Sequence, residues 1–395
     1  MAQIDSIEGS GFPLGFQVSN SQRRPGVLGT QSSRDTFTVE ARMLKGHQRE
    51  GVVKEGTSGS SWRLTCDEGK HLKGTDLAPF PLGFFNAGLH SDLMGRMTAL
   101  AEARSIQLDD LNIDLQNHFW MTGSFFRGTG EGFADPATVA VKVKSPHSAA
   151  DLMNLIHDSI KASPAMAAMR IPITNTFAIY ANGRRRAVAE LTASKADDAP
   201  DPYVTYTSPP RPLQEWTDNH SLIRKTGEVE SGEITPAPTG TTTRIIRNIK
   251  GHSSLLDKAG IVETDTVLGL PGMSHFALKS DERSASECAP CGLSLQAAGI
   301  AFCFMTQLGR YIEHMKFEIE GIRMVQYSPY AVTQDANGFN GVAEPVDTHL
   351  FLNGRAADED FARLMLIAAR TCYLHATLAA ALNPKVSVEL NGESV

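Results

Sequence analysis

The chain has 395 residues, which is enough for two to three domains of ordinary size and excludes a single small domain. Hydrophobic residues make up 41% and charged residues 21% of it, a composition typical of globular proteins and not of fibrous or wholly disordered ones. The formal charge of -7 repels phosphate backbones and anionic lipid headgroups, so we expect no nucleic acid and no membrane among its partners.

The N-terminus and the cysteines indicate an intracellular protein. Acids stand near the N-terminus where a signal peptide has bases, and the longest apolar run, residues 297–305, is too short to cross a bilayer. Five cysteines are too few for a disulfide framework in a chain of this length, and all except Cys66 lie in the second half. We therefore expect a cytoplasmic protein whose reduced thiols serve thiol chemistry or metal binding.

The predicted elements occur twice, in the same order. Lys45-Gly46-His47 is matched by Lys250-Gly251-His252, and the alternating strand at 62–68, which ends in an acidic turn, is matched at 276–282. Each half continues with a long helix (81–104 and 292–314), a strand (from 111 and 317), another strand (139–143 and 346–352), a second helix (from 148 and 358) and a closing strand (177–183 and 386–392). The offsets stay between 205 and 214, which indicates duplicated domains. We read His47 and His252 as exposed loop residues.

These matches give the domain boundaries. An N-terminal arm covers residues 1–34, the first domain 35–183, a polar linker 184–240 and the second domain 241–395. The linker is rich in proline, as connecting segments are, but its Tyr203, Tyr206 and Trp216 are apolar enough for part of it to dock on a domain.

Two cysteines lie on predicted helices of the second domain. Cys303 borders the apolar stripe of the long helix, and Cys372 faces inward on the second helix. A partly shielded thiol near an interface is the expectation for Cys303.

This pattern resembles the OsmC/Ohr family of thiol-dependent hydroperoxide reductases. Cys303 lies in the middle of the long helix, as the reactive family cysteine does, and Cys372-Tyr-Leu-His375 is similar to the segment of the second family cysteine. The first half has Asp92 and Ser163 at these positions. The resemblance implies an α+β fold with two OsmC-like domains, each an antiparallel sheet packed with two helices, which form an intramolecular pseudo-dimer with one working and one degenerate site.

The resemblance also implies an activity. Cys303 would attack an organic hydroperoxide and Cys372 would resolve the resulting sulfenic acid to a disulfide, with a small hydrophobic substrate, a dithiol or lipoyl reductant and no cofactor. The chain departs from the family in two respects, because Ser294 and Gly83 replace its glutamate, and its arginine has no evident counterpart. The cation that lowers the pKa of the thiol would then come from His252, His375, Arg310 or the first domain.

Other interpretations of the same cysteines stay open. Cys303 could be the nucleophile of a hydrolase that cleaves a thioester or a carbon-carbon bond of a diketone, with Asp92, His375 or His252 as the acid-base group. The chain could also be a binding protein without turnover, in which both cysteines are core residues. A homo-oligomer is compatible with each of these.

Three polar features have more than one interpretation. Asp92 lies among apolar residues and is either buried and paired or protonated, or turned to solvent. Cys288 and Cys291 form a Cys-x-x-Cys motif, a weak candidate for a zinc site completed by Cys303 and a histidine, His275 or His252, or else thiols that line a pocket or have no role. Ser294 is either a hydrogen-bond donor in the site or an ordinary helix residue.

Overall fold

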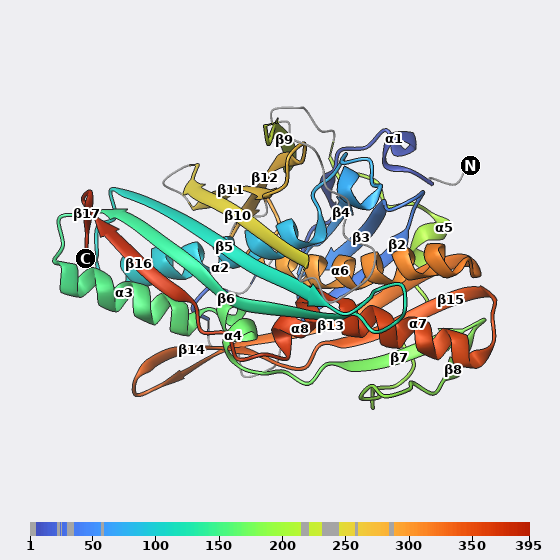
Figure 1. Cartoon of the computed structure of the whole chain (residues 1–395). Coiled ribbons are helices and arrows are strands. Elements are labelled where there is room, and N and C mark those ends of the chain that lie inside the picture. The colour runs from blue at the N-terminus through green and yellow to red at the C-terminus, as the bar shows by residue number, and fades with distance from the viewer. Residues whose placement is uncertain are drawn as a thin grey trace.

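The computed structural model describes residues 5–21, 24, 26–29, 35–56, 59–214, 221–230, 245–256, 260–283 and 288–395. These residues form an α+β fold in which two sheets lie on either side of a pair of long helices (Figure 1). The α+β expectation is confirmed.

Both halves contribute the same series of elements, at the positions that the sequence repeat predicts. The first half supplies β1 (Gly15–Ser19), β2 (Asp35–Met43), β3 (Arg49–Lys54), β4 (Ser61–Cys66), α2 (Pro81–Ala103), β5 (Asp110–Thr122), β6 (Glu131–Lys144), α3 (Ala149–Ala162), α4 (Pro164–Arg170), β7 (Thr176–Ala181) and β8 (Arg184–Arg186). The second half supplies β9 (Ile223–Glu228), β10 (Ile245–Leu255), β11 (Ile261–Leu268), β12 (Ser274–Asp281), α6 (Gly292–Met315), β13 (Glu318–Asp335), β15 (Asp347–Arg355), α7 (Asp358–Thr371), α8 (Tyr373–Leu378), β16 (Lys385–Leu390) and β17 (Glu393–Ser394). The elements without a counterpart are α1 (Ile7–Ser10), η1 (Lys70–Leu72), α5 (Tyr203–Thr207) and β14 (Gly338–Ala343).

Local sequence explains where the helices begin. Ser148 caps α3 by accepting a hydrogen bond from the backbone of Asp151 at 3.2 Å, as the capping pattern predicts. Pro81 occupies the first turn of α2, where its missing N–H costs nothing. Three acids, residues 358–360, form the first turn of α7, where their negative charges interact favourably with the positive end of the helix dipole.

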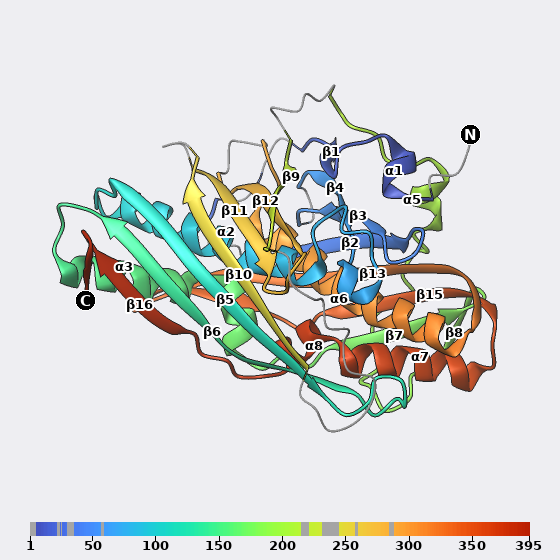
Figure 2. The ribbon, with the colours of Figure 1, turned by 45° about the horizontal axis from the view of Figure 1, so that its top comes forward.

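Each sheet is built from both halves of the chain. One sheet has the order β1-β4-β3-β2-β13-β15-β7-β8, with β14 also pairing with β13, and the other has the order β9-β12-β11-β10-β5-β6-β16-β17. The second order is the first with the halves exchanged. Figure 2 shows one of the two junctions, where β10 of the second half lies beside β5 of the first. The expectation of one antiparallel sheet per domain is corrected in two ways. Each sheet contains strands of both halves, and β15–β7 and β16–β6 are parallel pairs in otherwise antiparallel sheets.

The Lys-Gly-His match is not part of the repeat. Gly46 lies in the turn between β2 and β3 at a positive φ of 62°, whereas Gly251 lies within β10 and pairs with Leu115. His47 is buried, contrary to the expectation of an exposed loop residue, and its Nε2 atom lies 3.4 Å from Glu313. His252 is exposed, but on a strand and paired with Asp114 at 2.7 Å.

The two long helices cross in the centre of the molecule with almost no space between their backbones. A Cβ atom on Gly88 of α2 would lie 2.6 Å from the backbone nitrogen of Gln296, and one on Gly299 of α6 would lie 2.6 Å from that of Phe85. The N-terminal halves of the helices overlap there in opposite directions, and their C-terminal halves extend toward opposite ends of the molecule (Figure 1). The two ends of the crossing are therefore equivalent places in the fold.

Part of the predicted linker packs on the protein. In α5, the buried Tyr206 donates a hydrogen bond of 2.7 Å to the backbone oxygen of Glu40. Asp201 forms an ion pair of 2.6 Å with Arg323. The docking of Tyr206 agrees with the sequence expectation, while Trp216 lies outside the described residues.

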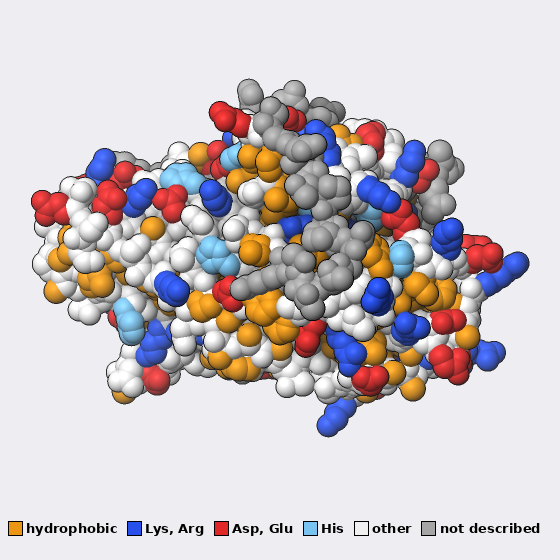
Figure 3. Space-filling view, in the orientation of Figure 1, with side chains coloured by type: hydrophobic (Ala, Val, Ile, Leu, Met, Phe, Trp, Pro, Cys, Tyr) orange, Lys and Arg blue, Asp and Glu red, His pale blue; other side chains and the backbone are white. Residues whose placement is uncertain are grey.

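Helix α6 is long and apolar enough to cross a membrane by length and composition alone. In this fold 94% of its apolar window is buried, against α2 and the strands β2, β3 and β13. Its apolar character is therefore accounted for by its place in the core. On the face seen in Figure 3, basic and acidic side chains are interspersed.

Candidate active site

Two cysteines and a histidine of the second half lie together at one end of the helix crossing. Cys303 comes from α6, and Cys372 is the residue between α7 and α8. Each thiol shifts the pKa of the other, so the two lie close together, and both are free. Nδ1 of His375, one turn into α8, lies 3.2 Å from Sγ of Cys372. The structure thus brings together three of the four catalytic residues that the sequence predicts.

The pKa values of the two thiols are shifted in opposite directions. Burial raises the pKa of Cys303 well above the ordinary value of a thiol, and its contact with Cys372 adds to this. The pKa of Cys372 is lowered despite its burial, because the neighbouring Cys303 and His375 stabilise its charge. These two directions favour a thiolate on Cys372 over one on Cys303.

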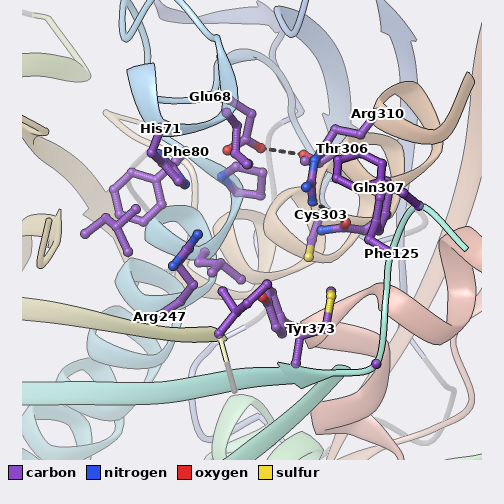
Figure 4. A pocket seen from close by; sticks show the side chains of 18 of the residues that line it. Glu68, His71, Phe80, Phe125, Arg247, Cys303, Thr306, Gln307, Arg310 and Tyr373 are labelled. Atoms are coloured by element: carbon purple, nitrogen blue, oxygen red, sulfur yellow. Dashed lines mark hydrogen bonds between the residues drawn. The ribbon is translucent and has the colours of Figure 1, made fainter. Parts of the chain in front are cut away.

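Cys303 lines a pocket whose walls come from both halves. Cys303 is only 2% exposed, so a substrate reaches it through this pocket and not from open solvent. The first half contributes residues of α2 and of the loop after β5, and the second contributes α6, the start of β10 and Tyr373 (Figure 4). The apolar part of the lining consists of Leu72, Phe80, Pro81, Leu82, Met121, Phe125, Phe126, Ile245 and Leu268.

A buried ion pair of the first half lies against the turn of α6 that carries Cys303. Arg49 of β3 is fully buried and pairs with Glu68 at 3.1 Å. The same guanidinium donates to the backbone oxygen of Phe302 at 3.2 Å and to the hydroxyl of Thr306, which in turn donates to Glu68 at 2.5 Å. The first half thus places a buried ion pair against the backbone of Phe302, the neighbour of Cys303, but the pKa of Cys303 is raised, so the expected cation that lowers it is not found in Arg49.

Two more arginines, Arg247 of β10 and Arg310 of α6, line the same pocket. Arg310 lies over the ring of Phe125, 4.3 Å from its centroid, and donates to Gln307 at 3.0 Å. Arg247 donates to the backbone oxygen of Ile246 at 2.9 Å. Among the described residues, neither guanidinium has a carboxylate at ion-pair distance.

Asp92 lies at the opposite end of the helix crossing. Its backbone is next to Gly292, and Cys303 is 11 residues further along α6, about 16 Å at the rise of an α-helix. Asp92 is fully buried and forms an ion pair of 2.7 Å with Arg96. The structure therefore selects the buried and paired interpretation of Asp92 and does not bring it to the thiols.

A second pocket, with a more polar set of residues, lies at this end of the helix crossing. It is lined by Arg24, Glu55, Arg96, Glu282, Cys291 and Tyr330, among others. Burial and the neighbouring Asp92 raise the pKa of Glu282 to about 7. Ser294 donates to Glu55 at 3.1 Å, so it belongs to this pocket and not to that of Cys303.

The Cys-x-x-Cys motif is also remote from Cys303. Cys291 precedes Cys303 by 12 residues, about 18 Å along α6, so the two cannot ligate one zinc ion. Cys291 is buried beside Ser294, whereas Cys288 is exposed. His275 and His252 pair with Asp265 and Asp114, and within the described part of the chain no three His, Cys, Asp or Glu side chains are grouped to hold a metal.

Sequence reasoning missed the contribution of Arg49, Glu68 and Arg247. Arg49 and Glu68 belong to the half that lacks both cysteines, and their role depends on the exchange of strands between the halves. One signal was available, because Arg49 shares a strand face with Gly51 and Val53, and a buried arginine needs a partner.

Part of the half that carries the thiols matches a known family. Residues 284–387, which include Cys303, Cys372 and His375, match the family described as OsmC-like protein. This part of the chain is therefore similar to an OsmC-like domain, in agreement with the resemblance seen in the sequence. Among solved structures, the chain is similar to an OsmC-like hydroperoxide resistance protein from Jannaschia sp. CCS1, with 20% identity, coverage of 37% of this chain and 95% of that chain, and a TM-score of 0.26. A comparison with curated proteins gives no match.

Proposed function

We propose that the protein is a thiol-dependent peroxidase that reduces organic hydroperoxides with Cys303 and Cys372. The observation that carries the proposal is the grouping of the two thiols with His375, whose Nδ1 lies 3.2 Å from Sγ of Cys372, beside a mostly apolar pocket that Cys303 lines. The OsmC-like domain that contains both cysteines supports the same class of activity.

The chemistry follows from the shared proton. Movement of the Cys303 proton to Cys372, next to His375, leaves a thiolate on the sulfur that faces the pocket. This thiolate attacks the terminal oxygen of the hydroperoxide and breaks the O–O bond, which gives a sulfenic acid on Cys303 and releases the alcohol after protonation. The sulfur of Cys372 then attacks the sulfenic sulfur, a disulfide forms and water leaves. Two thiols and one hydroperoxide thus give one disulfide, one alcohol and one water.

An external dithiol, of the soluble or the lipoyl kind, closes the cycle by thiol-disulfide exchange. We place this reaction in the cytoplasm, where such reductants keep thiols reduced.

Mass spectrometry of the reduced protein after addition of cumene hydroperoxide tests the proposal. We expect a loss of two hydrogens and a peptide that links Cys303 to Cys372. The variant Cys372→Ser should accumulate a sulfenic acid on Cys303 that dimedone traps, and Cys303→Ser should not react. Cys288→Ser is the control, since Cys288 lies outside the pocket, and it should react as the unmodified protein does. An unchanged mass of the folded, reduced protein would refute the proposal.

A second candidate is a cysteine hydrolase, and the contact of His375 with Cys372 favours it. A histidine next to a thiol is the arrangement that activates a nucleophile for acyl transfer. A thioester or a diketone would then leave an acyl adduct on a cysteine. The same mass spectrum separates the candidates, because an acyl adduct adds mass whereas a disulfide removes two hydrogens.

A further inference from the structure

The end of the helix crossing without the thiol pair keeps a pocket at the matching place of the repeat. Leu82 lines the thiol pocket and Leu293 lines the second pocket, and each is the second residue of its long helix. Glu68 and Glu282, the acids that end the matched strand segments, line the two pockets in the same way. The peroxidase chemistry proposed above uses only the thiol pocket, so the second pocket has no role in it.

The second pocket lacks a reactive nucleophile among the residues described. The cysteine of its lining, Cys291, is buried, and burial raises the pKa of this thiol well above its ordinary value. Asp92, which stands at the repeat position of Cys303, is held in an ion pair of 2.7 Å with Arg96. The pocket is therefore suited to binding and not to covalent chemistry.

Two buried donor side chains line this pocket. Arg96 is 4% exposed, and its Nη1 atom has no hydrogen-bond partner in the described part of the chain, because Asp92 accepts only from Nε and Nη2. The ring of Tyr330 packs edge-on against Phe37, with 5.6 Å between the centroids. Burial and the nearby Asp92 raise the pKa of Tyr330, so its hydroxyl keeps the proton and can donate it. A buried donor without an acceptor is costly, so an acceptor atom of a ligand would stabilise this arrangement.

The charges around the pocket exclude a charged ligand. Arg96 is balanced by its ion pair, and Arg24 is balanced by Glu55 at 2.9 Å. Glu282, whose pKa is raised to about 7, and Asp35 can add only negative charge, which repels an anion. A cation is disfavoured by the unpartnered N–H of Arg96, which needs an acceptor. A neutral molecule with an acceptor oxygen satisfies both conditions.

We propose that this pocket is a binding site for a small neutral carbonyl compound. Its oxygen accepts hydrogen bonds from Nη1 of Arg96 and from the hydroxyl of Tyr330, since a carbonyl oxygen has two lone pairs. Its apolar body contacts Phe37, Leu293 and Val332, which belong to the lining. The site is independent of the thiol pair, so the ligand is bound and released unchanged.

Three probes of nearly equal size and shape test the site. Acetophenone, a ketone, and benzamide, an amide, carry a carbonyl oxygen, whereas α-methylstyrene has a methylene group in its place. Their dissociation constants are measured by saturation-transfer NMR on the reduced protein. We expect at least one carbonyl probe to bind about tenfold more tightly than α-methylstyrene, the size of one hydrogen bond to a charged group. Preference for one of the two carbonyl probes then identifies the ligand as a ketone or as an amide.

Matched variants at the two pockets locate the binding. Tyr330→Phe removes only the hydroxyl, so it should weaken the carbonyl probe about threefold to tenfold and leave α-methylstyrene unchanged. Leu293→Trp fills the second pocket and should abolish binding, whereas Leu82→Trp, the matching change in the thiol pocket, should not affect it. Cys303→Ser should bind the probe as the unmodified protein does, which separates this site from the peroxidase proposal.

Two results would overturn the assignment. One is the absence of any preference for a carbonyl probe in the unmodified protein. The other is carbonyl binding that survives Tyr330→Phe at full strength, or that is lost in Leu82→Trp and kept in Leu293→Trp. If Leu293→Trp does not fold, Tyr330→Phe decides alone, because it leaves the packing in place.

Discussion

The hydroxyl of Ser163 donates a hydrogen bond of 2.5 Å to the carboxylate of Asp92, in the first-half position that corresponds to the two thiols. The backbone contributes at the same place, because the N–H of Ala165 also donates to Asp92, at 3.2 Å. One end of the helix crossing thus holds a redox-capable pair and the other holds a fixed ion pair. We therefore expect substitutions at the thiol end to change the chemistry, and substitutions at the ion-pair end to change the stability of the fold.

Replacement of Asp92 by Asn should destabilise the fold without impairing the thiol chemistry. It leaves the guanidinium of Arg96 buried without its charge partner, which typically costs about 3–5 kcal/mol. Urea unfolding measures this loss, and the rate of disulfide formation in the folded variant should stay within about twofold. Asp158→Asn is the control, since its partner Arg104 is partly exposed and surface pairs contribute about 0–1 kcal/mol. A folded Asp92→Asn protein that has lost peroxide reduction would show that Asp92 acts in catalysis after all.

Replacement of His375 by Gln should raise the pH at which the thiolate forms. His375 stabilises the charge on Cys372, so its loss moves the pKa of that thiol upward, toward the ordinary value of about 8.5. Thiolate absorbance near 240 nm, followed from pH 5 to 9, reports the change. Cys66 and Cys291 do not interfere, because burial raises the pKa of both. His157→Gln, at a side chain that is 79% exposed, should leave the titration curve in place. A curve that does not move in His375→Gln would contradict the assignment of the thiolate to Cys372.

Replacement of Glu282 by Gln should stabilise the protein more at pH 8 than at pH 5. The pKa of Glu282 is raised from 4.5 to about 7 in the fold, so between these values the native state keeps a proton that the unfolded chain loses. Stability therefore falls as the pH rises through this window, by about 3 kcal/mol for a shift of this size, and the penalty persists above it. Gln has no such penalty and keeps an oxygen for the N–H of Gly292, which donates at 2.5 Å. Urea unfolding at both pH values, with the exposed Glu102→Gln as control, measures the difference. The same effect at pH 5 and pH 8 would count against a neutral Glu282.

Replacement of Gly299 by Ala should destabilise the helix crossing. The added Cβ would lie 2.6 Å from the backbone of Phe85, and overpacking of this kind costs about 1–3 kcal/mol. Gly309→Ala on the same helix is the matched control, because its Cβ would meet only the end of the flexible Met43 side chain, at 3.0 Å. An alanine is also the better helix former, so the control should be neutral or slightly stabilising. Thermal unfolding compares the two, and equal midpoints would refute the close contact.

The sequence predicts the elements well and their pairing poorly. The long helix expected at 292–314 is found at Gly292–Met315, because apolar periodicity is a local property of the chain. The exchange of strands is not local. When two halves carry equivalent strands, β10 could pair with β13 of its own half or with β5 of the other, and hydrophobic alternation favours neither.

The candidate site divides in the same way. Cys303, Cys372 and His375 could be predicted, because they lie on helices of one domain and match a family pattern. Arg49 and Glu68 could not, since only the exchanged sheets carry them to the opposite half. Asp92 was placed at the right position of the repeat, but the antiparallel crossing of the helices separates it from Cys303.

The joining of both halves in one polypeptide frees the two ends of the helix crossing from each other. In an assembly of identical subunits, any substitution would appear at both ends, so a wall residue such as Leu82 would have to serve beside a thiol and beside an ion pair alike. In this chain, each of these positions occurs once. Arg49 and Cys303 belong to one end of the crossing and can change without any change at the other end, and the same holds for Asp92 relative to Arg247. Substitutions can therefore change the wall of the pocket without changing the nucleophile. The end of the crossing that contains the ion pair can be selected for stability alone.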